Sequence, residues 1–334
     1  MEPYFLLVLC LSLSLSVAQA PSCKALALEG GGAHGAYQAG ALIGLIQSLP
    51  PGTLSWNVVT GISAGSLNAG ATSMYAPGDE QNLAGFLNET WSTLKGFSSV
   101  MKNWPLGPIQ GVLWESALFD SSPLKATLTS KFSGDIKRNI TVGATNLESA
   151  ALGLFNESIG STAMIEACLS SSSIPCIFPK QNFQGQYWVD GGVKMDVNPF
   201  DAIMRCLDVA AEDQITIDIV FCSAATEDQG AYNYTTVNVI YRAEQIKSYD
   251  KSRWMIYEAQ DAFPAVTFRY LVQPSQTLKG ITAIDFRPEI MKENLEIGYK
   301  DGVSAAQAND DVVPIIQAWR NQLMVVRPFQ RASS

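Results

Sequence analysis

A glycine-flanked serine between an apolar strand and a small-residue helix most constrains how this chain can fold. Gly61-Ile62-Ser63-Ala64-Gly65 follows the stretch 55–60, which ends in the β-branched Val58-Val59-Thr60, and precedes the small-residue segment 66–74. The glycines permit a sharp turn, and the following helix brings partial positive charge close to the serine. Strand, tight turn and helix in this order are typical of a hydrolase nucleophile, although such a turn can also carry an idle serine. The pattern makes Ser63 a candidate nucleophile.

The histidine content excludes the usual way of activating that serine. The 334 residues contain one histidine, His34, and it precedes Ser63. The α/β-hydrolase order requires a histidine after the serine, and the chymotrypsin order requires an acid between the two. Residues 30–78 contain no Asp or Glu, and only Glu2 and Glu29 precede His34 for a subtilisin order. We therefore expect a group other than a triad histidine to activate Ser63.

A second glycine cluster, residues 30–35, lies between a strand-like segment at 25–29 and a helix-like segment at 36–46. It fits a dinucleotide-binding fingerprint, but that site needs an acid about 20 residues later for the ribose. No acid occurs between Glu29 and Asp79, and no Lys or Arg between Lys24 and Lys95 that could bind a 2′-phosphate. The alternative is an oxyanion hole, formed by the backbone N–H groups of Gly30, Gly31 and Gly32.

A third motif, Asp190-Gly191-Gly192, ends the aromatic and β-branched segment 186–189. Alone, this tripeptide is most often a turn. If its strand ends beside that of Ser63, Asp190 can accept the serine proton. Partial desolvation would make the carboxylate a better base, because burial disfavours its charged form.

In this order and spacing, the three motifs resemble those of the patatin-like phospholipase family. Softer matches lie at 172–175, 178–179, 197–199 and 297–299. The resemblance implies a Ser63–Asp190 dyad without histidine, an oxyanion loop at residues 30–32, and supporting glycines at Gly61, Gly65, Gly191 and Gly192. It implies no cofactor and no metal. Many members have Arg at the position of His34, which leaves the role of this histidine open.

The resemblance and the pattern of the remaining chain predict the same fold class. Helix-like segments at 79–95, 161–170, 199–208 and 238–261 alternate with strand-like segments at 139–145, 151–156, 214–223 and 265–272. Such alternation favours a mostly parallel central sheet between helices, and hence a three-layer, patatin-like α/β fold. No composition shift or linker marks a second domain, so we expect residues 21–334 to form a single acyl hydrolase domain.

Residues 1–20 are typical of a secretory signal peptide, with an apolar run that ends in small residues. Four sequons, at Asn88, Asn139, Asn156 and Asn233, agree with a glycoprotein that is secreted or resides in the endomembrane lumen. After removal of Cys10, five cysteines remain. Disulfides Cys168–Cys176 and Cys206–Cys222 are one interpretation, and buried thiols are the other.

The formal net charge of −9 argues against nucleic acid as a partner and against electrostatic capture by anionic lipid. A transient membrane or lipid interface would therefore depend on apolar contact. Residues 97–119 are rich in aromatic and aliphatic side chains and form either a lid or interfacial loop or, more commonly for such a stretch, part of the core.

Together these features predict a lipid acyl hydrolase, whether a phospholipase A or an acylglycerol or ester hydrolase. We expect Ser63 to lie in an apolar cleft that can hold the acyl chain of a lipid or ester substrate. The alternative is a catalytically weak glycoprotein that binds or stores lipid on the same fold.

Overall fold

The computed structural model describes residues 20–223, 236–280, 284–308 and 310–323. Nearly all of the expected signal peptide lies outside the described residues, as does Asn233. Among the described helices, none is both long and apolar enough to cross a bilayer.

The described chain alternates strands and helices along its length. The strands are β1 (Cys23–Leu28), β2 (Val58–Ile62), β3 (Lys102–Asn103), β4 (Phe119–Asp120), β5 (Asn139–Asn146), β6 (Leu152–Asn156), β7 (Gln181–Phe183), β8 (Gln186–Asp190), β9 (Ile215–Val220) and β10 (Thr267–Val272). The α-helices are α1 (Gly35–Ser48), α2 (Ala64–Ser73), α3 (Glu80–Ser92), α4 (Pro108–Leu113), α5 (Ser122–Lys131), α6 (Ser161–Ser171), α7 (Pro199–Leu207), α8 (Thr236–Ala262), α9 (Pro288–Ala308) and α10 (Val313–Leu323). Short 3₁₀ turns include η1 (Gly32–His34), η2 (Gly96–Ser99) and η4 (Gly191–Val193).

One mixed sheet organises the molecule, in the strand order β10-β9-β1-β2-β5-β8-β7, with β6 also paired to β5. The five strands from β10 to β5 are parallel. Strands β6 and β8 pair with β5 in antiparallel fashion, and β7 does so with β8. The expected α/β class with a mostly parallel sheet is confirmed.

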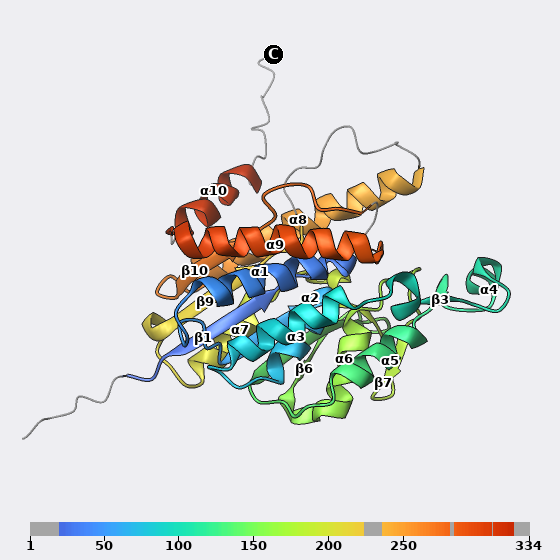
Figure 1. The fold of residues 1–334 in the computed structure, drawn as a ribbon, viewed down its shortest axis with the longest axis horizontal. Coiled ribbons are helices and arrows are strands. Elements are labelled where there is room, and N and C mark those ends of the chain that lie inside the picture. The colour runs from blue at the N-terminus through green and yellow to red at the C-terminus, as the bar shows by residue number, and fades with distance from the viewer. Residues whose placement is uncertain (1–19, 224–235, 281–283, 309, 324–334) are drawn as a thin grey trace, which may run out of the picture.

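The two faces of the sheet bury separate cores, as the alternation of side chains along a strand requires. On β1, Leu26 and Leu28 pack in a cluster with residues of α1, α2, α3, α5, α6 and α9. Cys23, Ala25 and Ala27 point the other way, into a cluster with α7, α8 and α10. The three-layer arrangement is therefore confirmed, with helices on both faces of the sheet (Figure 1).

Helix α9 lies along α1 at backbone contact, as Figure 1 shows. A Cβ atom added to Gly40 of α1 would lie 2.0 Å from the carbonyl oxygen of Leu295, and one on Gly298 of α9 would lie 1.9 Å from that of Tyr37. Any side chain here would force the helices apart. Gly298, the glycine of the match at 297–299, thus allows the two helices to pack closely.

The expected elements correspond closely to those observed. Segments 79–95, 161–170, 199–208 and 238–261 match α3, α6, α7 and α8, and the four expected strands match β5, β6, β9 and β10. The serine-bearing strand starts at Val58 rather than at 55, and its helix starts directly after Ser63. The sequence pattern does not predict α9 and α10 as separate helices.

Residues 97–119 depart from the commoner expectation that such a stretch is core. Met101 is buried, but five large apolar side chains in the stretch are 63–68% exposed. These are Leu106, Ile109, Val112, Leu113 and Trp114. The core interpretation is wrong for them, because β3, β4 and α4 form an arm that projects from the body of the molecule (Figure 1).

The disulfide connectivity also differs from the expected pairs. Cys23 and Cys206 are joined, with their Cα atoms 5.4 Å apart, whereas Cys168, Cys176 and Cys222 are free thiols. The expected Cys168–Cys176 and Cys206–Cys222 bridges are therefore wrong. Helix α7 packs on the face of β1 that carries Cys23, so tertiary contact selects a partner 183 residues away in the sequence.

We expect the Cys23→Ser/Cys206→Ser double variant to lose about 2–5 kcal/mol of unfolding free energy, because the open chain gains denatured-state entropy. Denaturant unfolding with and without reductant measures this. Reductant should bring the wild type to the level of the variant. Cys176→Ser, which removes an exposed free thiol, is the matched control and should leave stability unchanged. Equal stability of the oxidised wild type and the double variant would contradict the pairing.

Candidate active site

Two strands meet end to end along one edge of β5. Strand β2 pairs with residues 139–143 of β5, and β8 pairs with residues 144–146. Strand β6 pairs with residues 141–145 and overlaps both, so it occupies the opposite edge. Because β2 runs parallel and β8 antiparallel to β5, their carboxyl ends face each other between Gly143 and Ala144. This topology brings Ser63, directly after β2, to Asp190, the last residue of β8.

Ser63 occupies a backbone conformation that L-amino acids rarely adopt, with φ 51° and ψ −124°. Such a conformation costs about 1–3 kcal/mol and persists only when its surroundings hold it. The Ser63 N–H donates to Ser171 Oγ at 2.9 Å, and that hydroxyl donates to the Gly143 carbonyl at 2.6 Å. Ser66 Oγ donates to the Ser63 carbonyl at 2.6 Å. The sharp turn is thus held on both sides of the serine.

The supporting glycines allow backbones to approach the turn closely. A Cβ on Gly65 would lie 2.4 Å from the Leu28 carbonyl oxygen, and one on Gly61 would lie 2.2 Å from that of Gly65. A Cβ on Gly191 would meet the Gly143 carbonyl oxygen at 2.3 Å. A Cβ on Gly192 would lie 2.7 Å from a carboxylate oxygen of Asp196. The backbone contacts at Gly61, Gly65 and Gly191 therefore exclude a side chain, whereas one at Gly192 would require the Asp196 carboxylate to move.

Ser63 and Asp190 share a short hydrogen bond. Ser63 Oγ donates to Asp190 Oδ2 at 2.6 Å, and the Gly192 N–H donates to Asp190 Oδ1 at 2.7 Å. Both side chains are nearly buried. Burial raises the pKa of Asp190 to about 7, against the opposing effect of these two hydrogen bonds. A carboxylate with such a pKa can accept a proton from a hydroxyl near neutrality.

The glycine loop lies against this pair. A Cβ on Gly30 would lie 3.1 Å from Ser63 Cβ, and Gly32 lines the same pocket as Ser63. Of the three expected donors, Gly30 already donates its N–H to the Asp196 carbonyl at 2.8 Å. Within the described part of the chain, the N–H groups of Gly31 and Gly32 have no acceptor. Of the three glycines expected to donate to an oxyanion, only Gly31 and Gly32 therefore have a free N–H group among the described residues.

An apolar pocket opens at Ser63 and runs between α2, α3 and α5. Its lining includes Leu67, Leu87, Trp91, Leu128, Phe132 and Phe178. This agrees with the expected apolar cleft. A surface of this kind favours a hydrocarbon chain, since burial of apolar area is stabilising and requires no polar partner.

Comparison with known proteins agrees with this geometry. A model of the patatin-like phospholipase family matches residues 26–204, which is more than half of the chain and includes the glycine loop, Ser63 and Asp190. The chain belongs to the patatin-like phospholipase family. Membership indicates a lipid hydrolase in general, with lipid or ester substrates.

The fold is similar to that of VipD from Legionella pneumophila, at 13% identity and a TM-score of 0.43, over 86% of this chain and 67% of that chain. No curated protein matches the sequence.

The patatin-like domain also contains buried polar residues that the motifs did not identify as part of the site. Glu29 directly precedes the glycine loop, and its Oε2 accepts the N–H groups of Cys222 at 2.6 Å and Ser223 at 2.9 Å. Gln38 of α1 donates to the Glu29 carbonyl at 3.1 Å. These contacts hold the end of β1 in place. Their only sequence signal is an acid or amide within an otherwise apolar run.

A third supporting residue, Lys251 of α8, donates to the Gly192 carbonyl at 2.6 Å and pairs with Asp196 at 2.9 Å. Asp196 in turn accepts the Gly30 N–H through its carbonyl. The two loops beside Ser63 are thus joined through one ion pair.

His34, where many members of the family carry Arg, is separate from the Ser63–Asp190 pair. The carboxylate contacts the serine directly, with no imidazole between them. Burial lowers the pKa of His34 to about 4, so its ring is neutral near pH 7. Among the described residues, no group of three His, Cys, Asp or Glu side chains could hold a metal ion.

The raised pKa of Asp190 predicts how stability depends on pH. Its folded pKa of about 7 exceeds the ordinary 3.8, so protonation favours the folded state. That contribution is complete below the ordinary value and is lost as the pH rises through about 7. Asp190→Asn cannot ionise and avoids this loss. We therefore expect the Tm of the variant, relative to wild type, to increase between about pH 4 and pH 8.

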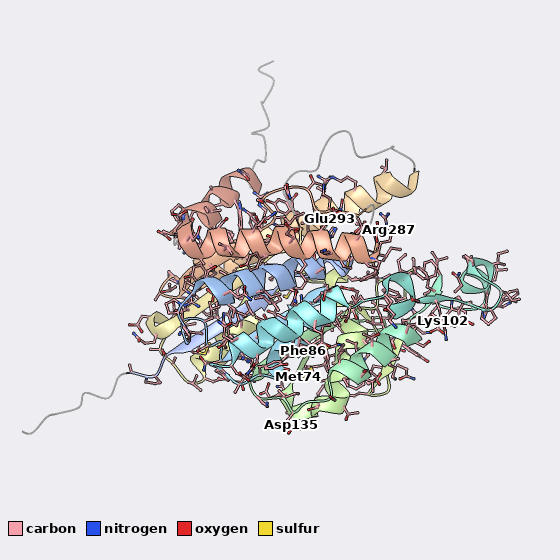
Figure 2. All side chains as sticks on the ribbon, in the orientation of Figure 1. Met74, Phe86, Lys102, Asp135, Arg287 and Glu293 are labelled. Atoms are coloured by element: carbon pink, nitrogen blue, oxygen red, sulfur yellow. A yellow bond between two sulfur atoms is a disulfide. The ribbon has the colours of Figure 1, made fainter. Side chains whose placement is uncertain are left out.

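Thermal unfolding across this range measures the difference. Asp135→Asn, at an exposed aspartate labelled in Figure 2, is the matched control, and its difference from wild type should stay constant with pH. A constant difference for Asp190→Asn as well would contradict a buried carboxyl group with a raised pKa.

Proposed function

We propose that this chain is a serine carboxylic-ester hydrolase that removes acyl chains from lipids, with Ser63 and Asp190 as its catalytic dyad. The observation that carries the proposal is the 2.6 Å hydrogen bond between Ser63 Oγ and Asp190 Oδ2 at the end of an apolar pocket. The family supports lipid hydrolysis in general, and the hydrogen bond supports this particular pair.

In the first step, Ser63 Oγ attacks the ester carbonyl carbon while Asp190 Oδ2 takes the hydroxyl proton. The carbonyl oxygen becomes an oxyanion, which the N–H groups of Gly31 and Gly32 stabilise. Such donors typically contribute a few kcal/mol to an acyl-transfer transition state. The intermediate collapses to an acyl-serine, and Asp190 returns the proton to the departing alcohol oxygen.

In the second step, Asp190 takes a proton from water, and the resulting hydroxide attacks the acyl-serine carbonyl. Collapse of this second intermediate releases the fatty acid and returns the proton to Ser63 Oγ. A pKa of about 7 suits both directions of transfer, since the carboxylate is ionised for half of the molecules near neutrality.

We expect Ser63→Ala and Asp190→Asn each to lower kcat/KM at least about a thousandfold, because loss of a nucleophile or its base removes most of the rate enhancement. Hydrolysis of a short-chain p-nitrophenyl ester in the presence of EDTA measures this. Wild-type kcat/KM should rise with pH through about 7, as Asp190 ionises. His34→Ala should retain a substantial part of the activity, since the loop donates through its backbone.

Ser92→Ala and Asp135→Asn, both at exposed positions, are matched controls that should leave the activity unchanged. If His34→Ala were inactive and Asp190→Asn active, the proton acceptor would be misassigned. A folded wild-type protein without esterase activity would instead favour the alternative, a glycoprotein that binds or stores lipid in the same pocket.

We also propose that residues 1–20 are removed as a signal peptide and that residues 21–334 form one patatin-like domain in the secretory pathway. The Cys23–Cys206 disulfide supports this location, because such bonds persist in oxidising compartments. Among the sequons, Asn88 on α3 and Asn156 at the end of β6 are exposed. Asn139, the first residue of β5, is partly buried.

We expect protein made in the secretory pathway of eukaryotic cells to carry glycans on at least Asn88 and Asn156. Asn88→Gln and Asn156→Gln should each remove one glycan, as intact mass and deglycosylation gels would measure. Asn139→Gln is the comparison at a less accessible position. An unmodified chain that still begins at Met1 would contradict the proposed location.

A further inference from the structure

The arm formed by residues 102–120 has an apolar tip, which carries the five most exposed large apolar side chains among the described residues. The tip consists of Leu106, Ile109, Val112, Leu113 and Trp114, each 63–68% exposed. No charged residue occurs from 103 to 114. Figure 2 labels Lys102 at the base of this arm, and Figure 1 shows α4 at its far end, apart from the sheet. Exposure of this much apolar side chain on one protruding element marks an interaction site.

The arm is a built structure. Trp104 Nε1 donates to the Ala117 carbonyl at 3.0 Å, joining its two halves, and Gly111 of α4 is buried against the same returning segment. At the base, Lys102 pairs with Asp120 at 3.2 Å. The apolar side chains of α4 are therefore held on the outside by the packing behind them.

Several backbone N–H groups of the tip are bonded within the arm itself. The Gly107 N–H donates to the Trp104 carbonyl at 2.8 Å, and the Leu106 N–H donates to Gln110 Oε1 at 3.2 Å. The N–H groups of Trp114 and Glu115 both donate to the Gln110 carbonyl, at 2.9 and 3.2 Å. An unpaired donor would be costly in a medium without hydrogen-bond acceptors. These bonds lower the cost of placing the tip in hydrocarbon, which favours lipid as its partner.

The arm is continuous with the wall of the acyl pocket. Val100 precedes it, Leu124 follows it, and both line the pocket together with Ser63. On its return, the arm bonds to the chain beside Phe178, another lining residue: Leu118 N–H donates to the Cys176 carbonyl at 2.9 Å. The segments at both ends of the arm therefore belong to the pocket wall, so the arm is connected directly to the candidate site.

We propose that the apolar tip inserts into the surface of a neutral or zwitterionic lipid layer and brings the pocket mouth to its substrate. The inference rests on the proposed function, which makes lipid the substrate. The net charge of −9 and the uncharged tip leave apolar burial as the attractive force, so anionic lipid adds nothing.

The test uses the double variant Ile109→Asp/Val112→Asp in full-length protein that also carries Ser63→Ala, so that binding is measured without turnover. We expect binding to phosphatidylcholine vesicles in co-sedimentation to weaken at least about tenfold, since two large apolar side chains lose their burial. Met204→Asp/Val209→Asp replaces two other exposed apolar residues with the same charge and should bind as before.

In the background with Ser63 intact, the tip variant should hydrolyse a soluble p-nitrophenyl ester at the wild-type rate but hydrolyse phosphatidylcholine vesicles more slowly. If the wild-type protein did not hydrolyse the soluble ester, the proposed function would be wrong, but the vesicle-binding result would remain valid. Equal vesicle binding by tip and control variants would overturn the inference. So would binding that requires added phosphatidylserine, or a wild-type dimer that the tip variant converts to a monomer without affecting vesicle binding.

Discussion

The meeting of two strand ends on one edge of β5 is the constraint on which the site depends. Strand β2 and strand β8 approach each other from opposite directions, so the residue after one and the last residue of the other come into contact. The 2.6 Å bond from Ser63 to Asp190 follows from this topology. Because the junction lies in the interior of the sheet, the same arrangement desolvates the carboxyl group and raises its pKa to about 7. Position and basicity thus have one structural origin.

Hydrogen bonds hold the strained turn at this junction. Ser63 adopts a backbone conformation that costs free energy, and Ser171 and Ser66 hold it from two sides. The Asp196–Lys251 pair joins the glycine loop to the Asp190 loop. These groups contribute no reacting atom to the proposed mechanism, but they fix the loop that carries the candidate donors Gly31 and Gly32. Preorganised donors of this kind stabilise developing charge without moving during the reaction.

The proposed chemistry and the proposed contact with lipid lie in different parts of the molecule. The Ser63–Asp190 pair and the pocket lie within the three-layer body, whereas the five most exposed large apolar side chains of the described residues lie on the arm between η2 and α5. A rigid interior is needed for the proton transfer, and an outward surface is needed to meet a lipid layer. The two parts are connected because Val100 and Leu124, on either side of the arm, line the pocket.

Local sequence patterns predicted most of the fold and pointed to the residues of the candidate site. Alternating strand and helix periodicity predicted the α/β class, and the single histidine excluded a triad before any contact was known. Tertiary structure alone decided which groups meet. It paired Cys23 with Cys206 and bonded the Gly30 N–H to the Asp196 carbonyl. It also exposed large apolar side chains of the 97–119 stretch, which is more commonly part of the core. Periodicity reports which face of an element is apolar, but contacts between residues far apart depend on strand order and packing, which no local pattern encodes.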